Sequence, residues 1–370
     1  MPPFNPLLNP PAYPAERYAP LADRLKRLLG TSNDVVFVQG EAIVALEAAA
    51  ASLSRPGMVA VNIVTSPYGG YFGQWLERGG ASITEITAQA GRPIGVDAVR
   101  AALSTLPRVD LVAIVHAETS SGMLNPLPEI AALAKAHGAL LVVDAVASFG
   151  GHALDVDALG LDVCVTGPQK AIGGSAGLSM VSVSARAWDS MAKAAARAPS
   201  TLSLLDLKHH WIEQGRGAVP GMPSALEFWA LEAALDAVEA EGLDNRLARH
   251  ALAAKATRAG LVAMGIEPWI DDDNEASALA TAAPVPPGID GDALIANAAA
   301  LGVSLTAGYG AVRGRLVRLD HSGTRAAFPS VIATVIGYGA ALARLGHPVD
   351  IGRAAAAIAA AYERGPLHAN

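Results

Sequence analysis

The sequence predicts an α/β protein whose larger part is a mostly parallel β-sheet with helices on both faces. From Asp34 to about Ser184, short β-branched runs alternate with segments of helical period. The runs are almost wholly apolar, which is typical of strands buried on both faces. Of the 370 residues, 52% are hydrophobic and 16% charged, so the chain can bury substantial cores and extended disorder is not expected.

The predicted strands share runs of Val, Ile, Leu and Ala. They are VVFV at 35–38, MVAVNIV at 58–64, LVAIVH at 111–116, ALLVVDA at 139–145, DVCVT at 162–166 and LSMVSVS at 178–184. Between them lie helical segments such as EAIVALEAAAASL and LPEIAALAKAHG, the latter ending on Gly138 as a C-cap. Ligands of such a sheet bind at the C-terminal ends of its strands.

Beyond this region the pattern predicts a second, smaller α+β domain. Residues 224 to about 262 are typical of two long helices split near Gly242. The later elements are predicted strands at 277–283, 303–307 and 315–319, a helix around DALIANAAALG, and helices near 329–344 and 349–363. We therefore expect a Pro-rich N-terminal arm at 1–20, a large domain at 21–245 and a small domain at 246–370.

Composition excludes several classes of function. The net charge of −7 argues against nucleic acid or an anionic membrane as a partner, because both require clustered Lys and Arg. No run of about 18 apolar residues and no signal-peptide pattern is present. The single cysteine, Cys164, rules out an intramolecular disulfide and a Cys-based zinc site. We expect a cytoplasmic protein without a metal.

Two ionisable residues follow buried strands. ALLVVD ends on Asp144, and DVCVT leads into GPQK, which places Lys170 just past its strand. Spacing alone leaves open that Asp144 caps a turn and that Lys170 lies in solvent.

Several motifs together resemble one family. DAVASFGG followed by DVCVTGPQKAIGG, the turn HAETSSG at 116–122 and the loop YGGYFGQW resemble class-V, fold-type I pyridoxal-phosphate aminotransferases of the alanine–glyoxylate and serine–pyruvate group. The resemblance runs in order from about residue 35 to 330. It implies a large domain with a seven-stranded, mostly parallel sheet, a small C-terminal α+β domain, and an active site formed between subunits of a homodimer or homotetramer.

The resemblance assigns the catalytic pair. It implies that Lys170 forms a Schiff base with the pyridoxal aldehyde and then moves a proton between the two reacting carbons. Asp144 is implied to hold the pyridine nitrogen protonated, so that the ring accepts electrons. A carboxylate opposite that nitrogen raises its pKa, which is the required direction.

The resemblance also implies the binding residues. Tyr68 matches the aromatic that stacks on the ring, and Thr119 matches the hydroxyl near the ring's phenolic oxygen. Val146 and Gln169 fall at cofactor-binding positions. Arg318, in RLVRLDHSG, matches the arginine that binds the carboxylate of the amino or oxo acid. A guanidinium suits this task because it can donate two parallel hydrogen bonds to a carboxylate.

Glu41 is unusual for this family, because it stands at the helix start that ordinarily binds the cofactor phosphate. Two unit charges about 4 Å apart repel by on the order of 4 kcal/mol at an effective dielectric of 20. Pro168 and Met222 stand where hydroxyl donors to the phosphate are common.

These features resemble the pyridoxamine–pyruvate transaminase branch, which transfers the amino group of unphosphorylated pyridoxamine to pyruvate, giving pyridoxal and L-alanine. We therefore expect no tightly bound cofactor, with pyridoxamine and pyruvate as substrates and vitamin B6 degradation as the setting.

One position departs from that branch, and it keeps alternatives open. Tyr309 stands in place of a second arginine, which Arg313 or Arg315 could replace from a shifted loop. The first alternative is a conventional pyridoxal 5′-phosphate-dependent alanine/serine–glyoxylate or pyruvate aminotransferase. A lyase on the same scaffold would use the same lysine, aspartate and arginine. A vitamin-binding protein without turnover would not need Lys170.

Overall fold

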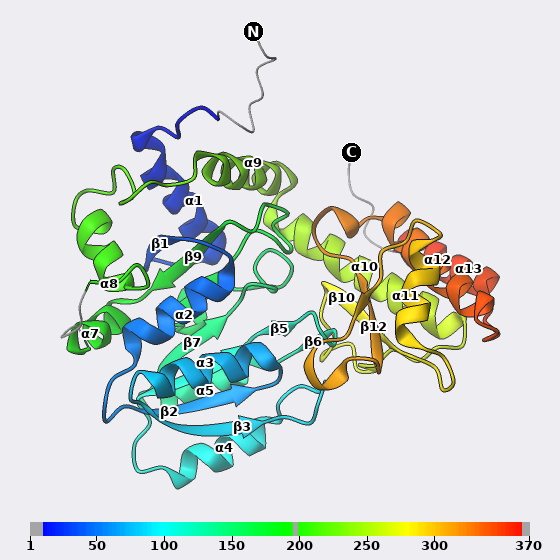
Figure 1. The fold of residues 1–370 in the computed structure, drawn as a ribbon, viewed down its shortest axis with the longest axis horizontal. Helices are drawn as coiled ribbons and strands as arrows, with labels where there is room; N and C mark the ends of the chain where they lie inside the picture. Colours follow the sequence, from blue (N-terminus) through cyan, green and yellow to red (C-terminus); the bar gives the residue numbers. More distant parts are fainter. Residues whose placement is uncertain (1–9, 195–198, 365–370) are drawn as a thin grey trace.

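A seven-stranded sheet forms the centre of the larger part of the molecule (Figure 1). The structure is a computed structural model that describes residues 10–194 and 199–364; residues 1–9 of the expected arm lie outside them. The sheet order is β1-β9-β8-β7-β4-β2-β3. Its strands are β1 (Asp34–Gln39), β2 (Val59–Val64), β3 (Ser82–Thr87), β4 (Leu111–Val115), β7 (Leu140–Asp144), β8 (Val163–Thr166) and β9 (Leu178–Val183). Only β9 runs antiparallel to its neighbours, so the predicted seven-stranded, mostly parallel sheet is confirmed.

Six of the seven strands match the apolar runs in the sequence, and β3 was not predicted. Its residues SITEIT alternate between exposed and half-buried positions. It pairs only with β2, at the edge of the sheet. An edge strand in this position needs no continuous apolar run, which is why no clear strand pattern marks it in the sequence.

Helices cover the sheet on both faces. In the larger part they are α1 (Tyr18–Leu29), α2 (Ala42–Leu53), α3 (Pro67–Arg78), α4 (Val96–Thr105), α5 (Leu127–Ala136), α6 (Val156–Leu159), α7 (Ala185–Lys193), α8 (Leu204–Leu207) and α9 (Ala225–Glu241). Short 3-10 turns lie at Ala15–Arg17, Gly310–Val312 and Gly323–Arg325, and a π turn lies at Lys208–Ile212. A two-stranded hairpin, β5 (Ala117–Glu118) with β6 (Met123–Leu124), follows β4.

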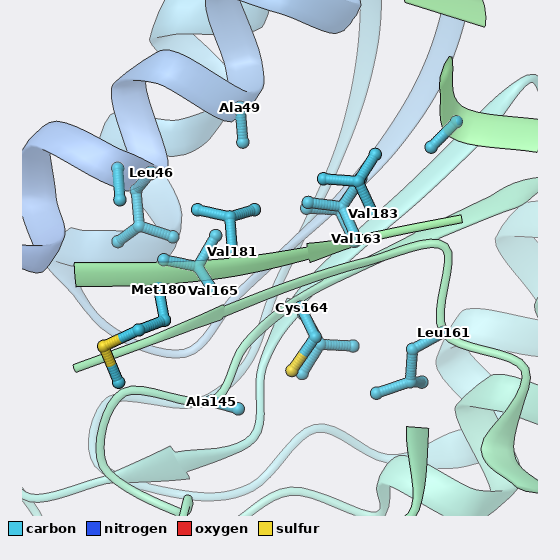
Figure 2. Close-up of a cluster of buried hydrophobic side chains, with 14 of the residues drawn as sticks. Leu46, Ala49, Ala145, Leu161, Val163, Cys164, Val165, Met180, Val181 and Val183 are labelled. Carbon is cyan, nitrogen blue, oxygen red and sulfur yellow. The ribbon is translucent and has the colours of Figure 1, made fainter. Parts of the chain in front are cut away.

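The packing of α2 on the sheet fixes where the site begins. Figure 2 shows Leu46 and Ala49 of α2 above the valines of β8 and β9, while Cys164 lies on the opposite face. All these side chains are buried. Complete burial of a Val or Leu side chain contributes about 1.5–3 kcal/mol relative to exposure. This packing holds the N-terminus of α2 near the C-terminal ends of the parallel strands.

The C-terminal elements gather at one end of the large sheet (Figure 1). They are α10 (Leu243–Ala263), α11 (Gly291–Ala299), α12 (Phe328–Arg344) and α13 (Ile351–Arg364), with the antiparallel sheet β10-β12-β11. Its strands are β10 (Ala280–Pro284), β11 (Thr306–Ala307) and β12 (Leu316–Asp320). The chain turns between α9 and α10 at Gly242, whose φ of 81° favours glycine.

Two hydrophobic cores support the domain division that we propose, 21–245 and 246–370. One core extends from Tyr13 to Val238, and the other from Ala253 to Ala361. Residues 15–20, which fall in the expected arm, are helical. Within the described part of the chain, no helix combines the length and apolar character needed to span a membrane.

Candidate active site

One cavity gathers most of the predicted site residues where β4, β7 and β8 end. Its lining combines the starts of α2 and α3, the β5 hairpin and the loops after β7 and β8. The lining residues are Glu41, Ala42, Ile43, Leu46, Tyr68, Val115, Ala117, Glu118, Thr119, Asp144, Val146, Ala147 and Lys170. Six of the eight predicted residues therefore share one cavity. Gln169 and Arg318 are not in the lining, but each contacts a residue that is.

Asp144 and Lys170 bring a carboxylate and an amine to the same cavity. Asp144 is the last residue of β7, and its Oδ1 accepts a hydrogen bond from the Val146 N–H at 3.0 Å. Burial raises the pKa of Asp144 to about 6, although the Val146 N–H and the Lys170 charge act in the opposite direction. The Lys170 amine makes no hydrogen bond or ion pair with any residue that the structure describes. Both groups are therefore available to a ligand.

Glu41 is the N-cap of α2. Its Oε2 accepts a hydrogen bond from the Ile43 N–H at 2.9 Å, and its Oε1 accepts one from Gln169 Nε2 at 2.7 Å. The amide oxygen of Gln169 is buried and has no hydrogen-bond partner among the residues that the structure describes. Helix capping and the side-chain contact together hold the Glu41 carboxylate in the lining of the cavity.

Arg318 reaches the cavity through Thr119. Its Nη1 lies 3.4 Å from the Thr119 carbonyl oxygen, and its Nη2 lies 3.9 Å from Asp320 Oδ2. Its Nε is buried and has no hydrogen-bond partner within the described residues. An unpaired buried N–H costs about 1–3 kcal/mol, so an incoming carboxylate would satisfy a group that the protein leaves open.

Tyr68 lies at the mouth of the cavity, near the start of α3, and is 41% exposed. Burial, and next the Glu41 charge, raise its pKa, while Arg318 lowers it. Its ring centroid is 5.9 Å from that of Tyr309, whose hydroxyl lies 3.2 Å from the hydroxyl of Tyr71. A loop of the small domain therefore contacts α3 beside Tyr68.

Arg313 and Arg315 lie in the same loop as Tyr309 but have different surroundings. The Arg315 guanidinium is 5.2 Å from the Trp269 ring centroid, in a cation–π contact. Arg313 is exposed and follows the short turn at Gly310–Val312. Tyr309, and not Arg315, is thus the side chain of this loop that contacts the tyrosines of α3.

Glu118 is a cavity residue to which the sequence analysis gave no role. It is 3% exposed, and burial raises its pKa to about 8. A carboxyl two residues after the apolar run LVAIVH was the available signal, because acidic side chains are rarely buried in full unless they are paired. Among the residues described, no group of three or more His, Cys, Asp or Glu is arranged to hold a metal ion.

Comparisons with known proteins agree with this geometry. The Aminotransferase class-V family matches residues 15–330. The pyridoxamine–pyruvate transaminase of Mesorhizobium japonicum is 39% identical over 339 residues, covering 91% of this chain and 86% of that protein. The crystal structure of pyridoxamine–pyruvate aminotransferase from Mesorhizobium loti has a TM-score of 0.89 and 38% identity, covering 94% and 88% of the two chains. Alanine–glyoxylate aminotransferase from Nostoc sp. has a TM-score of 0.83 and 27% identity, covering 89% and 87%.

The expectation of a site without a tightly bound cofactor is wrong. Class-V aminotransferases depend on pyridoxal phosphate, and the family match covers most of this chain. The expectation placed the Glu41 charge about 4 Å from a phosphate, with no other partner for its carboxylate. In the structure its carboxylate is exposed and accepts two hydrogen bonds, from Ile43 and Gln169, and both solvent and donors weaken its repulsion. Around the ring position, the Asp144 carboxylate, the Lys170 amine and the Tyr68 ring fit a pyridoxal group.

The chain belongs to the class-V aminotransferase family and is an aminotransferase.

Proposed function

We propose that this protein transfers the amino group of unphosphorylated pyridoxamine to pyruvate, giving pyridoxal and L-alanine. The observation that carries the proposal is the Lys170 amine, which has no hydrogen-bond or ion-pair partner among the described residues and shares one cavity with the Asp144 carboxylate and Glu41. The 39% identity with a pyridoxamine–pyruvate transaminase over most of both chains supports the choice of substrates.

The two ends of the cavity suit the two ends of pyridoxamine. At one end, the Glu41 carboxylate accepts hydrogen bonds and is a fitting acceptor for the hydroxymethyl O–H of pyridoxamine. Gln169 holds that carboxylate in place. At the other end, Asp144 keeps the proton on the pyridine nitrogen, and Val146 orients Asp144 through its N–H. Tyr68 covers the ring, and the Thr119 hydroxyl binds its phenolic oxygen.

Lys170 and Arg318 then act on the reacting atoms. When bound, the pyridoxal group supplies an aldehyde carbon for the exchange of amino groups and a ring that takes up the electron pair. Lys170 Nζ removes a proton from the carbon that bears the amino group and returns one to the carbon that receives it. Arg318 binds the carboxylate of pyruvate with its guanidinium, whose Nε–H has no partner among the described residues. That contact holds the carbonyl carbon of pyruvate within reach of Lys170.

We further propose that the protein works as a homodimer or homotetramer in the cytoplasm, in vitamin B6 degradation. Met222 is 96% exposed, which is unusual for a large apolar side chain and fits a contact with a second subunit. The one cysteine, Cys164, is buried and unpaired, as suits a reducing compartment.

The test compares two substrate pairs on the purified protein. One reaction contains pyridoxamine and pyruvate, and the other contains alanine and glyoxylate with added pyridoxal phosphate. We expect the first pair to be used with the higher kcat/KM and to yield pyridoxal. Efficient use of the second pair alone would instead identify a conventional alanine–glyoxylate aminotransferase.

A further inference from the structure

Two arginines at the start of α10 contact the segments that carry the two side chains acting on the substrates. Arg246 and Arg249 both pair with Glu241, the last residue of α9. Neither arginine belongs to the cavity lining, and the proposed mechanism gives neither of them a task. Their other hydrogen bonds go to backbone carbonyls that follow Lys170 and Arg318 in the chain.

Arg246 holds the backbone directly after Lys170. The arginine side chain is buried, and its Nε and Nη2 donate to the Ala171 carbonyl at 3.1 Å and 2.7 Å. Nη2 also donates to the Ile172 carbonyl at 2.8 Å. A planar guanidinium that donates to two successive carbonyls fixes the direction of the chain as well as its distance. Because Ala171 is the next residue after Lys170, this contact sets where the Lys170 backbone lies relative to α10.

Arg249 makes the corresponding contact with the turn that follows Arg318. Arg318 lies in β12, and the chain then enters the short helical turn at Gly323–Arg325. Arg249 Nη1 donates to the Gly323 carbonyl at 2.7 Å and to the Ala326 carbonyl at 3.2 Å. The contact therefore holds the end of β12, beyond Arg318, against the same helix.

The two held segments also approach each other closely at Gly323. A Cβ on this residue would lie 3.2 Å from the Lys170 carbonyl oxygen, and its φ of 59° favours glycine. The backbones that carry Lys170 and Arg318 therefore meet beside α10. The Glu241 carboxylate, which pairs with both guanidinium groups, offsets the repulsion between their like charges.

We propose that Arg246 and Arg249 are positioning residues with separate tasks, in which Arg246 places Lys170 and Arg249 places Arg318. The inference rests on the proposed function, because both targets belong to the same site. A misplacement of about 1 Å can cost on the order of a hundredfold in rate. Loss of the Arg246 contacts should therefore slow the proton transfers of Lys170, whereas loss of the Arg249 contacts should weaken the binding of pyruvate.

Steady-state kinetics with pyridoxamine and pyruvate separate the two tasks. Arg246→Gln should lower kcat by about tenfold or more and leave KM for pyruvate within about threefold of wild type. Arg249→Gln should raise that KM by about tenfold and change kcat by less than about threefold. Arg258→Gln is the matched control on the same helix and should leave both constants near those of wild type. Arg258 donates to the Ile270 and Asp271 carbonyls, which are not in the cavity lining. The same change of kcat and KM in the first two variants would refute the division of tasks.

Hydrogen exchange of the apoprotein gives a readout that does not depend on turnover. Arg246→Gln should speed amide exchange in the peptide 167–177 by about tenfold and change the peptide 318–327 by less than about threefold, and Arg249→Gln should do the reverse. Arg246→Lys keeps the charge beside Glu241 but loses the planar set of donors, so it should show a smaller increase in the first peptide. It decides the outcome if Arg246→Gln does not fold.

Equal increases in the two peptides, or no increase in either, would overturn the proposal for the variant concerned. If the wild type does not transfer the amino group of pyridoxamine to pyruvate, the proposed function fails. The exchange pattern then still decides whether Arg246 and Arg249 hold the segments of Lys170 and Arg318.

Discussion

Gln169 Nε2 donates a hydrogen bond to Glu41 Oε1 at 2.7 Å, and this contact joins the loop that carries Lys170 to the start of α2. The two residues lie far apart in the chain but meet because α2 packs over β8 and β9 (Figure 2). The position of the Glu41 carboxylate relative to Lys170 is therefore fixed by the sheet.

Glu41→Ala should weaken the use of pyridoxamine. Loss of a hydrogen bond to a charged acceptor costs about 1.5–3 kcal/mol, which corresponds to roughly a 10- to 100-fold decrease in kcat/KM. The steady-state rate with pyridoxamine measures this. The control substrate is 5′-deoxypyridoxamine, which lacks the hydroxyl that Glu41 is proposed to bind. An equal decrease with both substrates would rule out that contact.

Arg318→Lys should impair binding of the oxo acid. A lysine keeps the charge but loses the paired N–H groups, so we expect KM for pyruvate to rise by about 10-fold or more. The Kd for pyridoxamine, measured by titration without pyruvate, should change little. Arg315→Lys is the matched control, since Arg315 lies over Trp269. A similar rise in KM in both variants would contradict the role of Arg318.

Asp144→Asn should stabilise the apoprotein while it abolishes turnover. The folded-state pKa of Asp144, about 6, lies above its ordinary value of 3.8. The unfolded chain therefore ionises more readily, and stability is lost as the pH rises from about 4 through 6. Each pKa unit equals about 1.4 kcal/mol, so we expect about 1–3 kcal/mol of added stability at pH 7, allowing for partial exposure. Urea unfolding at pH 7 checks this, and a less stable variant would disprove the account.

Buried histidines should make the protein sensitive to acid. Burial lowers the pKa values of His116, His250 and His321 to about 4 and that of His152 to about 3. One of them joins the domains, because His152 Nε2 accepts from the Ala278 N–H. His250 Nε2 accepts from the Gly323 N–H within the small domain.

Because these pKa values lie below 6.5, the neutral histidines contribute stability that is complete above pH 6.5 and is lost as the pH falls towards 4. The slope should approach about 1.4 kcal/mol per pH unit for each histidine that protonates on unfolding. In His152→Asn, urea unfolding between pH 4.5 and pH 7 should depend less steeply on pH than in wild type. Exposed His137→Asn is the control, and equal slopes in all three proteins would contradict the prediction.

The sequence predicted the layers of the fold well. Buried parallel strands produce apolar runs, and their alternation with helical segments identifies a sheet covered by helices. It did not predict β3, whose half-exposed SITEIT pattern is that of an edge strand. In the small domain the predicted strand 303–307 is reduced to Thr306–Ala307, since only these residues pair with β12. The length of such a strand depends on how many of its residues pair with the partner strand, and the local sequence pattern carries no information about that pairing.

Site residues were predictable where they follow strands or occur in family motifs, as Asp144 and Lys170 do. The environment of Glu41 could not be predicted, because its contact with Gln169 depends on tertiary packing. The surroundings of Glu118 also depend on tertiary packing, because Thr65, which donates to its carboxyl group, comes from a distant segment. Sequence reasoning thus located the chemistry but not the charge states that govern it.

The central claim is that Lys170 moves the protons of an amino transfer from pyridoxamine to pyruvate. The most direct measurement is the yield of pyridoxal and alanine from these two substrates by wild type and by Lys170→Ala. We expect equal amounts of both products from the wild type and none from the variant, which should still bind pyridoxal. Sustained turnover by Lys170→Ala, or a wild type that forms no pyridoxal, would contradict the account.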